Sequence, residues 1–263
     1  MLRLLKIEID KLRGYRIFWA LSILYLFVMG IILFYLDSFH FGMYGTKRQG
    51  LQMDFGTLGI FSFPGIWHNV TYVAGFFKFF LAIVVVILVS GEYEYRTIRQ
   101  NIIDGMSRLE FFKSKIITLF LISLTAMIYV FIIIMIMGLK HTNDLSIEKV
   151  TEHSTFILAF FLEMLGYLSF VFFITHLVKK AAFVAGIYFI YTFIAEPVLA
   201  FKIDTIAPFL PLQAFGNLIH MPFAKYLGQS IPESVDLNDV TISLFYIVLF
   251  SFMSWLLIEK RDL

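Results

Sequence analysis

Long continuous runs of apolar residues dominate the pattern of hydrophobic and polar positions along this chain. Six runs are long enough to cross a bilayer, which takes a helix of about 20 apolar residues. Three carry no charge and three carry one charge each. They lie at residues 17–36, 72–90, 116–139, 155–178, 181–200 and 240–258. The runs do not alternate as the strands of a membrane barrel do. The pattern predicts an all-α membrane protein with six transmembrane helices.

The composition supports this prediction. The residues AVILMFWYC make up 60% of the 263 positions and charged residues 15%, whereas soluble domains carry about 25% charged residues. The net charge of +2 is too small to indicate binding of nucleic acid. The chain has no cysteine, which excludes disulfides, thiolate zinc sites and cysteine nucleophiles. Without a long linker, we expect a single transmembrane domain over residues 1–263.

The basic residues predict the orientation of the spans, because cytoplasmic segments are enriched in lysine and arginine. With the N-terminus inside, the inner segments hold 14 basic residues and the outer segments hold six. Both termini are therefore expected in the cytoplasm.

The first 16 residues have the pattern of an amphipathic helix. One helical face carries Leu2, Leu5, Ile9 and Leu12, and charged residues occupy the other side. Such a helix lies in the membrane interface. We expect an interfacial helix over 1–16 on the cytoplasmic side; the alternative is a basic anchor that only sets topology.

The inner segment at 91–115 is the most informative part of the sequence. Nine of its 25 residues are charged, and Asp104 and Gly105 form a turn signal. Ser107 and Glu110 have the spacing of a capping box, in which each side chain covers backbone N–H groups of a helix start. We therefore expect a short element at 95–103 and a new helix that begins near Arg108. A charged element fixed between two spans suits docking of a soluble partner, and a solvated topological loop is the alternative.

The outer segment at 201–239 contains four prolines, and three of them interrupt the apolar stretch 206–224. Proline cannot continue a helix interior, so a seventh straight span is not expected. A pair of short helices that dips into the outer leaflet fits this composition, and a surface loop with apolar patches is the alternative.

Three charged residues lie inside the spans, where charge is costly and marks candidate functional positions. Lys78 is close enough to the end of its span to extend its ammonium outward. Glu163 is about 12 Å deep at 1.5 Å per residue, and we expect it to pair with a residue such as Lys78, to line a transport path or to make a structural hydrogen bond. Glu196 is expected to cap the helix near Pro197.

No motif for a reaction is evident. The chain has no phosphate-binding loop of the form G-x-x-x-x-G-K-[ST], and its six histidines show no metal-ligand spacing. We expect no catalytic residue, no cofactor and no metal in this chain.

The segment from Glu92 to Lys115 resembles the loop between the second and third helices of ABC-2 type transporter permeases. The resemblance rests on Glu92, Thr97, Arg99, the run from Gly105 to Arg108, and Lys115. The charged ending at 259–263, the six spans, the inner termini and the interfacial helix are also similar to that family. The resemblance implies that the loop is a coupling helix, which docks into a groove of a separate ATP-binding subunit. It also implies a re-entrant hairpin on the outer side before the last helix.

On this resemblance the residues expected to couple the chain to its ATPase are Glu92, Arg96, Thr97, Arg99, Gln100, Asn101, Gly105, Ser107 and Arg108. ATP and Mg²⁺ would be held by the partner. The chain would be the permease subunit of an exporter in a bacterial inner membrane, beside a second permease copy or a paralogue. A secondary transporter or channel that works alone is one alternative, and an intramembrane enzyme is another.

Overall fold

The structure is a computed structural model, and it describes residues 2–37, 40–42, 52–54, 60–203, 205–223, 232 and 234–260. Its elements in chain order are α1 (Leu2–Gly14), α2 (Arg16–Asp37), β1 (His40–Gly42), β2 (Gln52–Asp54), α3 (Ile66–Gly75), α4 (Lys78–Glu94), α5 (Thr97–Ile103), α6 (Arg108–His141), α7 (Ile147–Thr151), α8 (Thr155–Val178), α9 (Ala181–Ile190), the π-helix η1 (Tyr191–Ala195), α10 (Glu196–Lys202), the 3-10 helix η2 (Ala207–Phe209), α11 (Pro211–Asn217) and α12 (Leu237–Lys260).

The prediction of a membrane protein with about six spans is confirmed. Among the described residues, five helical stretches are long and apolar enough to cross a membrane, and they include α2, α6, α8, α9–α10 and α12. The bent pair α3 and α4 brings the number to six. The two strands add only a short antiparallel hairpin to the expected all-α fold.

The span expected near 72–90 corresponds in the structure to the bent pair of helices α3 and α4. This span begins earlier, with α3 at Ile66, and bends by 45° before α4 begins at Lys78. At the bend, the N–H of Phe76 bonds to the carbonyl of Val73 and that of Phe77 to Ala74. These tighter i to i+3 bonds replace the α-helical ladder, so the helix axis changes direction there.

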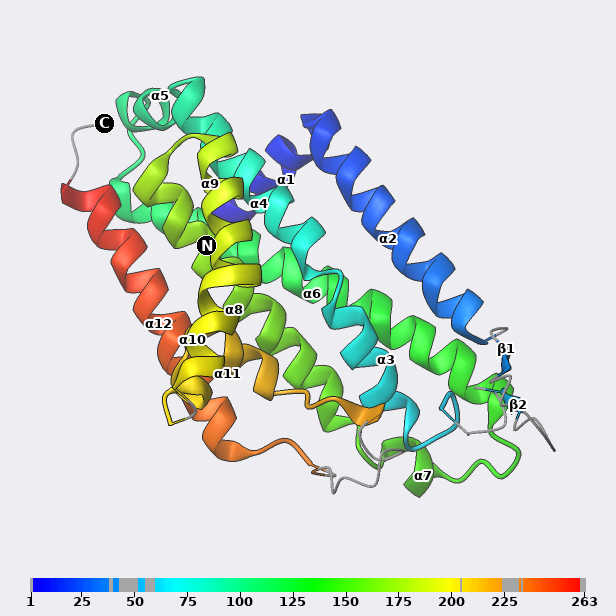
Figure 1. Cartoon of the computed structure of the whole chain (residues 1–263). Helices are drawn as coiled ribbons and strands as arrows, with labels where there is room; N and C mark the ends of the chain where they lie inside the picture. Colours follow the sequence, from blue (N-terminus) through cyan, green and yellow to red (C-terminus); the bar gives the residue numbers. More distant parts are fainter. Residues whose placement is uncertain are drawn as a thin grey trace.

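Helix α8 forms the centre of the bundle (Figure 1). It contacts α3, α4, α6, α9, α11 and α12. In an apolar part of 18 residues within the α7–α8 stretch, 72% of the residues are buried. The corresponding parts of α2 and of α9–α10 have 17% of their residues buried. A helix that is apolar on all sides belongs in a core, and α8 fits this with the buried side chains of Phe156, Phe160 and Phe172.

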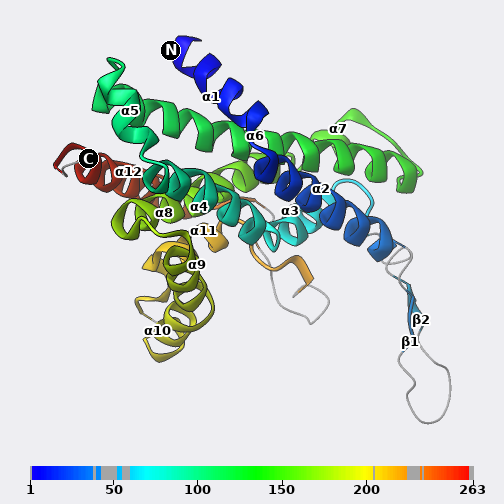
Figure 2. The same cartoon turned by 90° about the horizontal axis from the view of Figure 1, so that it is seen from above.

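Helices α2 and α9–α10 lie on different sides of the bundle (Figure 2). Both expose large apolar side chains, for example Phe27 at 64% and Phe183 at 63%. These faces suit contact with lipid tails or with another membrane chain.

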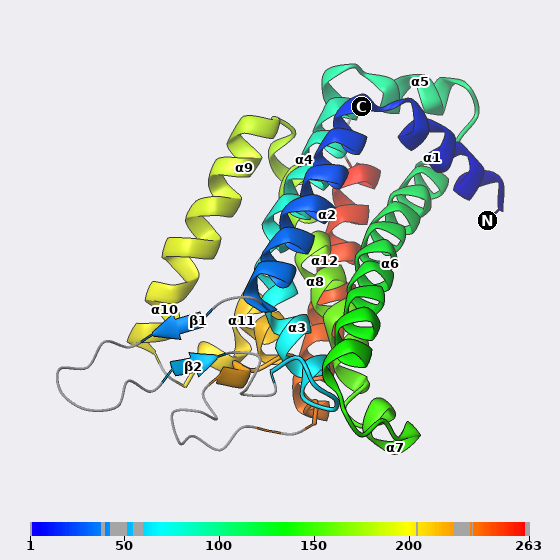
Figure 3. The ribbon, with the colours of Figure 1, turned by 90° about the vertical axis from the view of Figure 1, so that its right-hand side faces the viewer.

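The bundle has two distinct ends (Figure 3). Helix α1, helix α5 and the C-terminal end of α12 gather at one end, which we call the α5 end, while α7 and the β-hairpin lie at the other, the α7 end.

The segment at 201–239 is described in part, since residues 204, 224–231 and 233 lie outside the described residues. Its described part holds η2 and α11 and no seventh long apolar helix. Helix α11 packs against α8 and α12. The approach is close because a Cβ atom at Gly166 would overlap the ring of Phe215.

Candidate functional site

Both ends of α5 are held by specific backbone structures. The chain turns into α5 through Arg96, whose φ of 55° is left-handed. At the other end, Gly105 has a φ of 93°. Its N–H bonds to the carbonyl of Ile102 at 3.1 Å, and the N–H of Met106 bonds to that of Asn101 at 3.0 Å. This is a Schellman motif, which favours glycine in the left-handed position.

Helix α6 begins where the sequence predicted. Ser107 Oγ accepts the backbone N–H of Glu110 at 3.2 Å, and Glu110 Oε2 accepts the backbone N–H of Ser107 at 2.9 Å. The predicted capping box is thereby confirmed. Helix α6 continues for 34 residues to His141, about 51 Å at 1.5 Å per residue, so part of it extends beyond the hydrocarbon layer.

One face of α5 is buried and the other is exposed. Ile98 packs into a small apolar cluster with Met106, Phe111 and Ile258. The opposite face exposes Arg96, Arg99 and Gln100, and the flanking Tyr95 and Ile103 are 73% and 77% exposed. An exposed mixture of large apolar and basic side chains is typical of a protein-binding surface.

A groove of about 850 Å³ lies between α5 and the connection from α8 to α9. Arg96, Arg99, Lys179 and Lys180 line it, together with Glu92 and Glu94. The excess of basic groups favours an acidic partner surface.

Not every predicted coupling residue faces outward. Arg108 donates from Nη1 to the carbonyl oxygens of Ile258, at 3.2 Å, and Glu259. These belong to the last turn of α12, whose carbonyls have no partner within the helix. Asn101 is half-buried, and the hydroxyl of Thr97 donates to the backbone oxygen of Glu92 at 3.3 Å.

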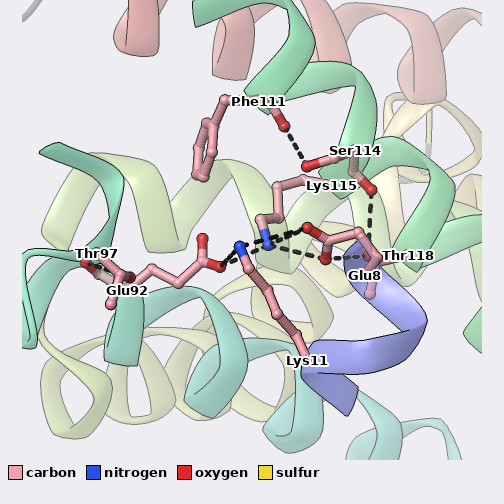
Figure 4. A network of polar contacts seen from close by, with 8 residues as sticks. All are labelled: Glu8, Lys11, Glu92, Thr97, Phe111, Ser114, Lys115 and Thr118. Atoms are coloured by element: carbon pink, nitrogen blue, oxygen red, sulfur yellow. Dashed lines mark hydrogen bonds and ion pairs between the residues drawn. The ribbon is translucent and has the colours of Figure 1, made fainter. Parts of the chain in front are cut away.

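Glu92 also turns inward, into a cluster of alternating charges with Glu8, Lys11 and Lys115 (Figure 4). The Nζ atom of Lys115 lies 2.6 Å from Glu92 Oε1 and 2.9 Å from Glu8 Oε2, and Lys11 Nζ lies 3.3 Å from Glu92 Oε1. The cluster joins α1, α4 and α6. Only two residues separate α4 from α5. The cluster therefore fixes the position at which the exposed helix α5 begins.

Glu8 is buried but remains an anionic partner. Burial raises the pKa of its carboxyl. The charges of Lys115 and Lys11 and the hydrogen bonds from Lys115 and Thr118 together lower this pKa by more than burial raises it, so the pKa lies below its ordinary value. Thr118 Oγ1 donates to Glu8 Oε2 at 2.8 Å.

The sequence contains a feature from which the buried ion pair of Glu8 could have been predicted. Glu8 is three residues after Leu5 and four before Leu12, which places this carboxylate on the apolar face of α1. An acid on such a face requires a buried partner.

Within the spans, Lys78 and Glu163 form an ion pair. Lys78 Nζ lies 2.8 Å from Glu163 Oε1 and 3.8 Å from the centre of the Tyr167 ring. The expected pairing of these two residues is therefore confirmed, and the outward extension of Lys78 is wrong because Glu163 and the Tyr167 ring hold the ammonium between α4 and α8.

Glu196 has a different role from the one expected. Its Oε1 atom accepts the backbone N–H of Gln213, in the first turn of α11. It therefore caps α11, 17 residues further along the chain, and does not cap the helix at Pro197. The sequence could not show this, because the partner lies on a separate element.

Among the described residues, no group of three or more histidine, aspartate or glutamate side chains is placed to hold a metal ion.

Comparison with known proteins identifies the family. The sequence model of a family described as ABC-2 family transporter protein matches residues 4–195, which is more than half of the chain. This range includes most of α1, the α5 segment and the Lys78–Glu163 pair. No curated protein matches the chain. With its transmembrane helices, the chain is a multi-pass membrane protein of the permease type, and it belongs to the ABC-2 family of transporter proteins.

Proposed function

We propose that this chain is the permease subunit of an ABC-2 type exporter in a bacterial inner membrane, and that a separate ATP-binding subunit docks at α5. ATP and Mg²⁺ would be bound by that subunit, and this chain would catalyse no reaction. The observation that carries the proposal is the geometry of α5: an exposed basic and apolar face on a short helix held at both ends.

The basic residues support an orientation with the α5 end in the cytoplasm. The described members of the 14 predicted inner residues lie on α1, at the start of α2, around α5 and the first turns of α6, between α8 and α9, and at the end of α12. All of these segments belong to the α5 end, so one orientation satisfies the positive-inside rule for every connection. Both termini would then be cytoplasmic, and α1 would lie in the inner interface.

The ion cluster supports a mechanical role for the same region. A partner that moves on ATP binding can displace the spans only through groups that contact it. A force on α5 would pass to α4, and from Glu92 through Lys115 to α6 and through Lys11 to α1. Helix α1 leads directly into α2, so the interfacial helix and the first span would follow.

The exposed apolar faces of α2 and α9–α10 support assembly with a second permease copy or a paralogue, with lipid covering the rest. On the outer side, α11 packs against α8 and α12, and the hydroxyl of Tyr167 donates to the carbonyl of Leu212 at 3.0 Å. These contacts support a re-entrant segment before the last helix.

Co-expression with the cognate ATP-binding subunit tests the proposal. Light scattering of the purified complex should find two copies of the 30.6 kDa chain with two ATP-binding subunits, and the complex should hydrolyse ATP. A chain that purifies without any ATP-binding subunit and moves solute across liposomes unaided would instead establish a stand-alone transporter.

A further inference from the structure

A cavity of about 370 Å³ lies against the Lys78–Glu163 pair, close to the bend between α3 and α4. Its lining includes both charged side chains and the polar residues Gln213, Asn217 and His220. Lys78 starts α4, about 24 Å from the last residue of that helix at 1.5 Å per residue. The cavity therefore lies toward the α7 end of the bundle, away from the α5 surface.

The bend and a glycine give Glu163 its place in this cavity. Gly75, the last residue of α3, faces the carboxylate, and a Cβ atom there would lie 3.3 Å from Oε1 and 3.4 Å from Oε2. The shortest contact between these two side chains joins Lys78 Nζ to Glu163 Oε1. The Lys78 ammonium has three N–H donors, and its side chain retains 20% exposure. Each member of the pair thus keeps bonding capacity beside the cavity.

The ion cluster at the α5 end offers a comparison, because a second ion pair lies beside the first one there. There the Lys115–Glu8 pair is joined by a second pair, Lys11–Glu92, so that positive and negative charges alternate (Figure 4). Glu8 is contacted by Lys115, Lys11 and Thr118. Both the cluster and the Lys78–Glu163 pair line cavities of similar volume, but the Lys78–Glu163 pair has no second ion pair among the described residues.

The charge of the pair selects the ligand. Lys78 and Glu163 together are neutral, so a ligand with a net charge would bring an uncompensated charge into a medium of low dielectric constant. A ligand with one cationic and one anionic group adds no net charge and completes the alternating arrangement. The amides of Gln213 and Asn217 offer further hydrogen bonds.

We propose that this cavity binds a zwitterionic head group, with its ammonium against Glu163 and its anionic group against Lys78. A phosphoethanolamine group esterified as a phosphodiester, in a lipid or in the water-soluble glycerophosphoethanolamine, has this chemistry. The proposal concerns this chain alone and does not depend on an ATP-binding subunit, so its failure would leave the coupling proposal untouched.

The test uses the purified full chain in an uncharged maltoside detergent, with binding followed by native mass spectrometry. The probes are dihexanoyl phosphatidylethanolamine, the anionic dihexanoyl phosphatidylglycerol with the same acyl chains, and glycerophosphoethanolamine, a soluble zwitterion. We expect the ethanolamine lipid to bind about tenfold or more tightly than the glycerol lipid, a difference within the range measured for close charge pairs. Competition by glycerophosphoethanolamine would show that the head group suffices, and binding of the lipid alone would identify a lipid source. Equal binding of the two lipids would overturn the proposal.

The matched variant is the double substitution Lys78→Gln and Glu163→Gln, which removes both charges without leaving one buried and unpaired. It should abolish the preference for the ethanolamine lipid, whereas Lys202→Gln, at an exposed lysine outside the cavity, should keep it. A folded double variant with an unchanged preference would contradict the site. The lipid comparison on the unmodified chain decides the question even if the double variant does not fold.

Discussion

Lys115 on α6 and Glu92 on α4 are joined by an ion pair of 2.6 Å between Nζ and Oε1. Glu8 of α1 contacts the same ammonium, at 2.9 Å. Lys115 is therefore the common partner of two carboxylates from different helices, and it is only 5% exposed. Lys115 and Lys11, which lies 3.3 Å from Glu92 Oε1, together connect α1 to the base of the α5 segment.

Replacing Lys115 by methionine should destabilise the chain strongly. The substitution removes the buried cation that contacts both carboxylates and leaves them only the more exposed Lys11, and breaking a buried pair in this way costs about 3–5 kcal/mol. Thermal unfolding in detergent measures the effect. Lys113→Met, at an exposed position two residues earlier, is the control and should stay within about 0.5 kcal/mol. Equal unfolding temperatures for the two variants would mean that the cluster contributes nothing.

The lowered pKa of Glu8 predicts a dependence of stability on pH. A carboxyl whose pKa is lower in the folded than in the unfolded chain stabilises the fold above its unfolded value, and this contribution disappears as the pH falls through the folded value. The contribution should therefore be complete at neutral pH and be lost below its ordinary value of 4.5. Unfolding of the wild type and of Glu8→Gln, compared from pH 7 to pH 3, should show a smaller difference at the acidic end. A difference independent of pH would refute the assignment.

Ser107→Ala should weaken the start of α6 while leaving the exposed face of α5 intact. Loss of the N-cap oxygen costs about 1 kcal/mol. We expect the ATP-binding subunit still to bind, with a lower rate of ATP hydrolysis by the complex, because α5 would be held less firmly at this end. Binding titrations and hydrolysis rates separate the two effects. Loss of binding together with an unchanged rate of ATP hydrolysis per bound complex would contradict this prediction.

The orientation is accessible to cysteine labelling, since the chain contains no cysteine. Ser107 and Asn143 are both exposed and lie beside opposite ends of α6. Single cysteines at these positions should react with an impermeant maleimide from opposite sides of the membrane, Asn143→Cys from outside and Ser107→Cys from the cytoplasm. Labelling of both from one side would exclude the proposed topology.

The sequence predicted those features that depend on local physics. Continuous apolar runs located the spans, and the four-residue pattern from Ser107 to Glu110 located the start of α6, because a capping box is formed within one turn. The pattern did not reveal the bend at Phe76, because the run from 72 to 90 contains no proline and its one charge, Lys78, does not by itself indicate a bend. It also missed the role of Glu8, since its partner Lys115 is 107 residues away. Glu196 was assigned to the wrong helix for the same reason.

The central claim is that α5 is the element on which an ATP-binding subunit docks, and a double charge reversal tests it most directly. Arg96→Glu and Arg99→Glu together change the exposed basic face and the adjoining groove, while surface substitutions usually alter stability by about 0.5 kcal/mol or less. Lys202→Glu, an exposed charge reversal outside the α5 groove, is the control.

The measurement is the amount of the ATP-binding subunit that co-purifies with each variant, with the unfolding temperature recorded alongside. We predict that the Arg96 and Arg99 double variant loses most of its bound subunit and keeps a near wild-type unfolding temperature, and that the Lys202 variant keeps both. Wild-type recovery of the ATP-binding subunit with the double variant would contradict the claim that α5 is the docking element.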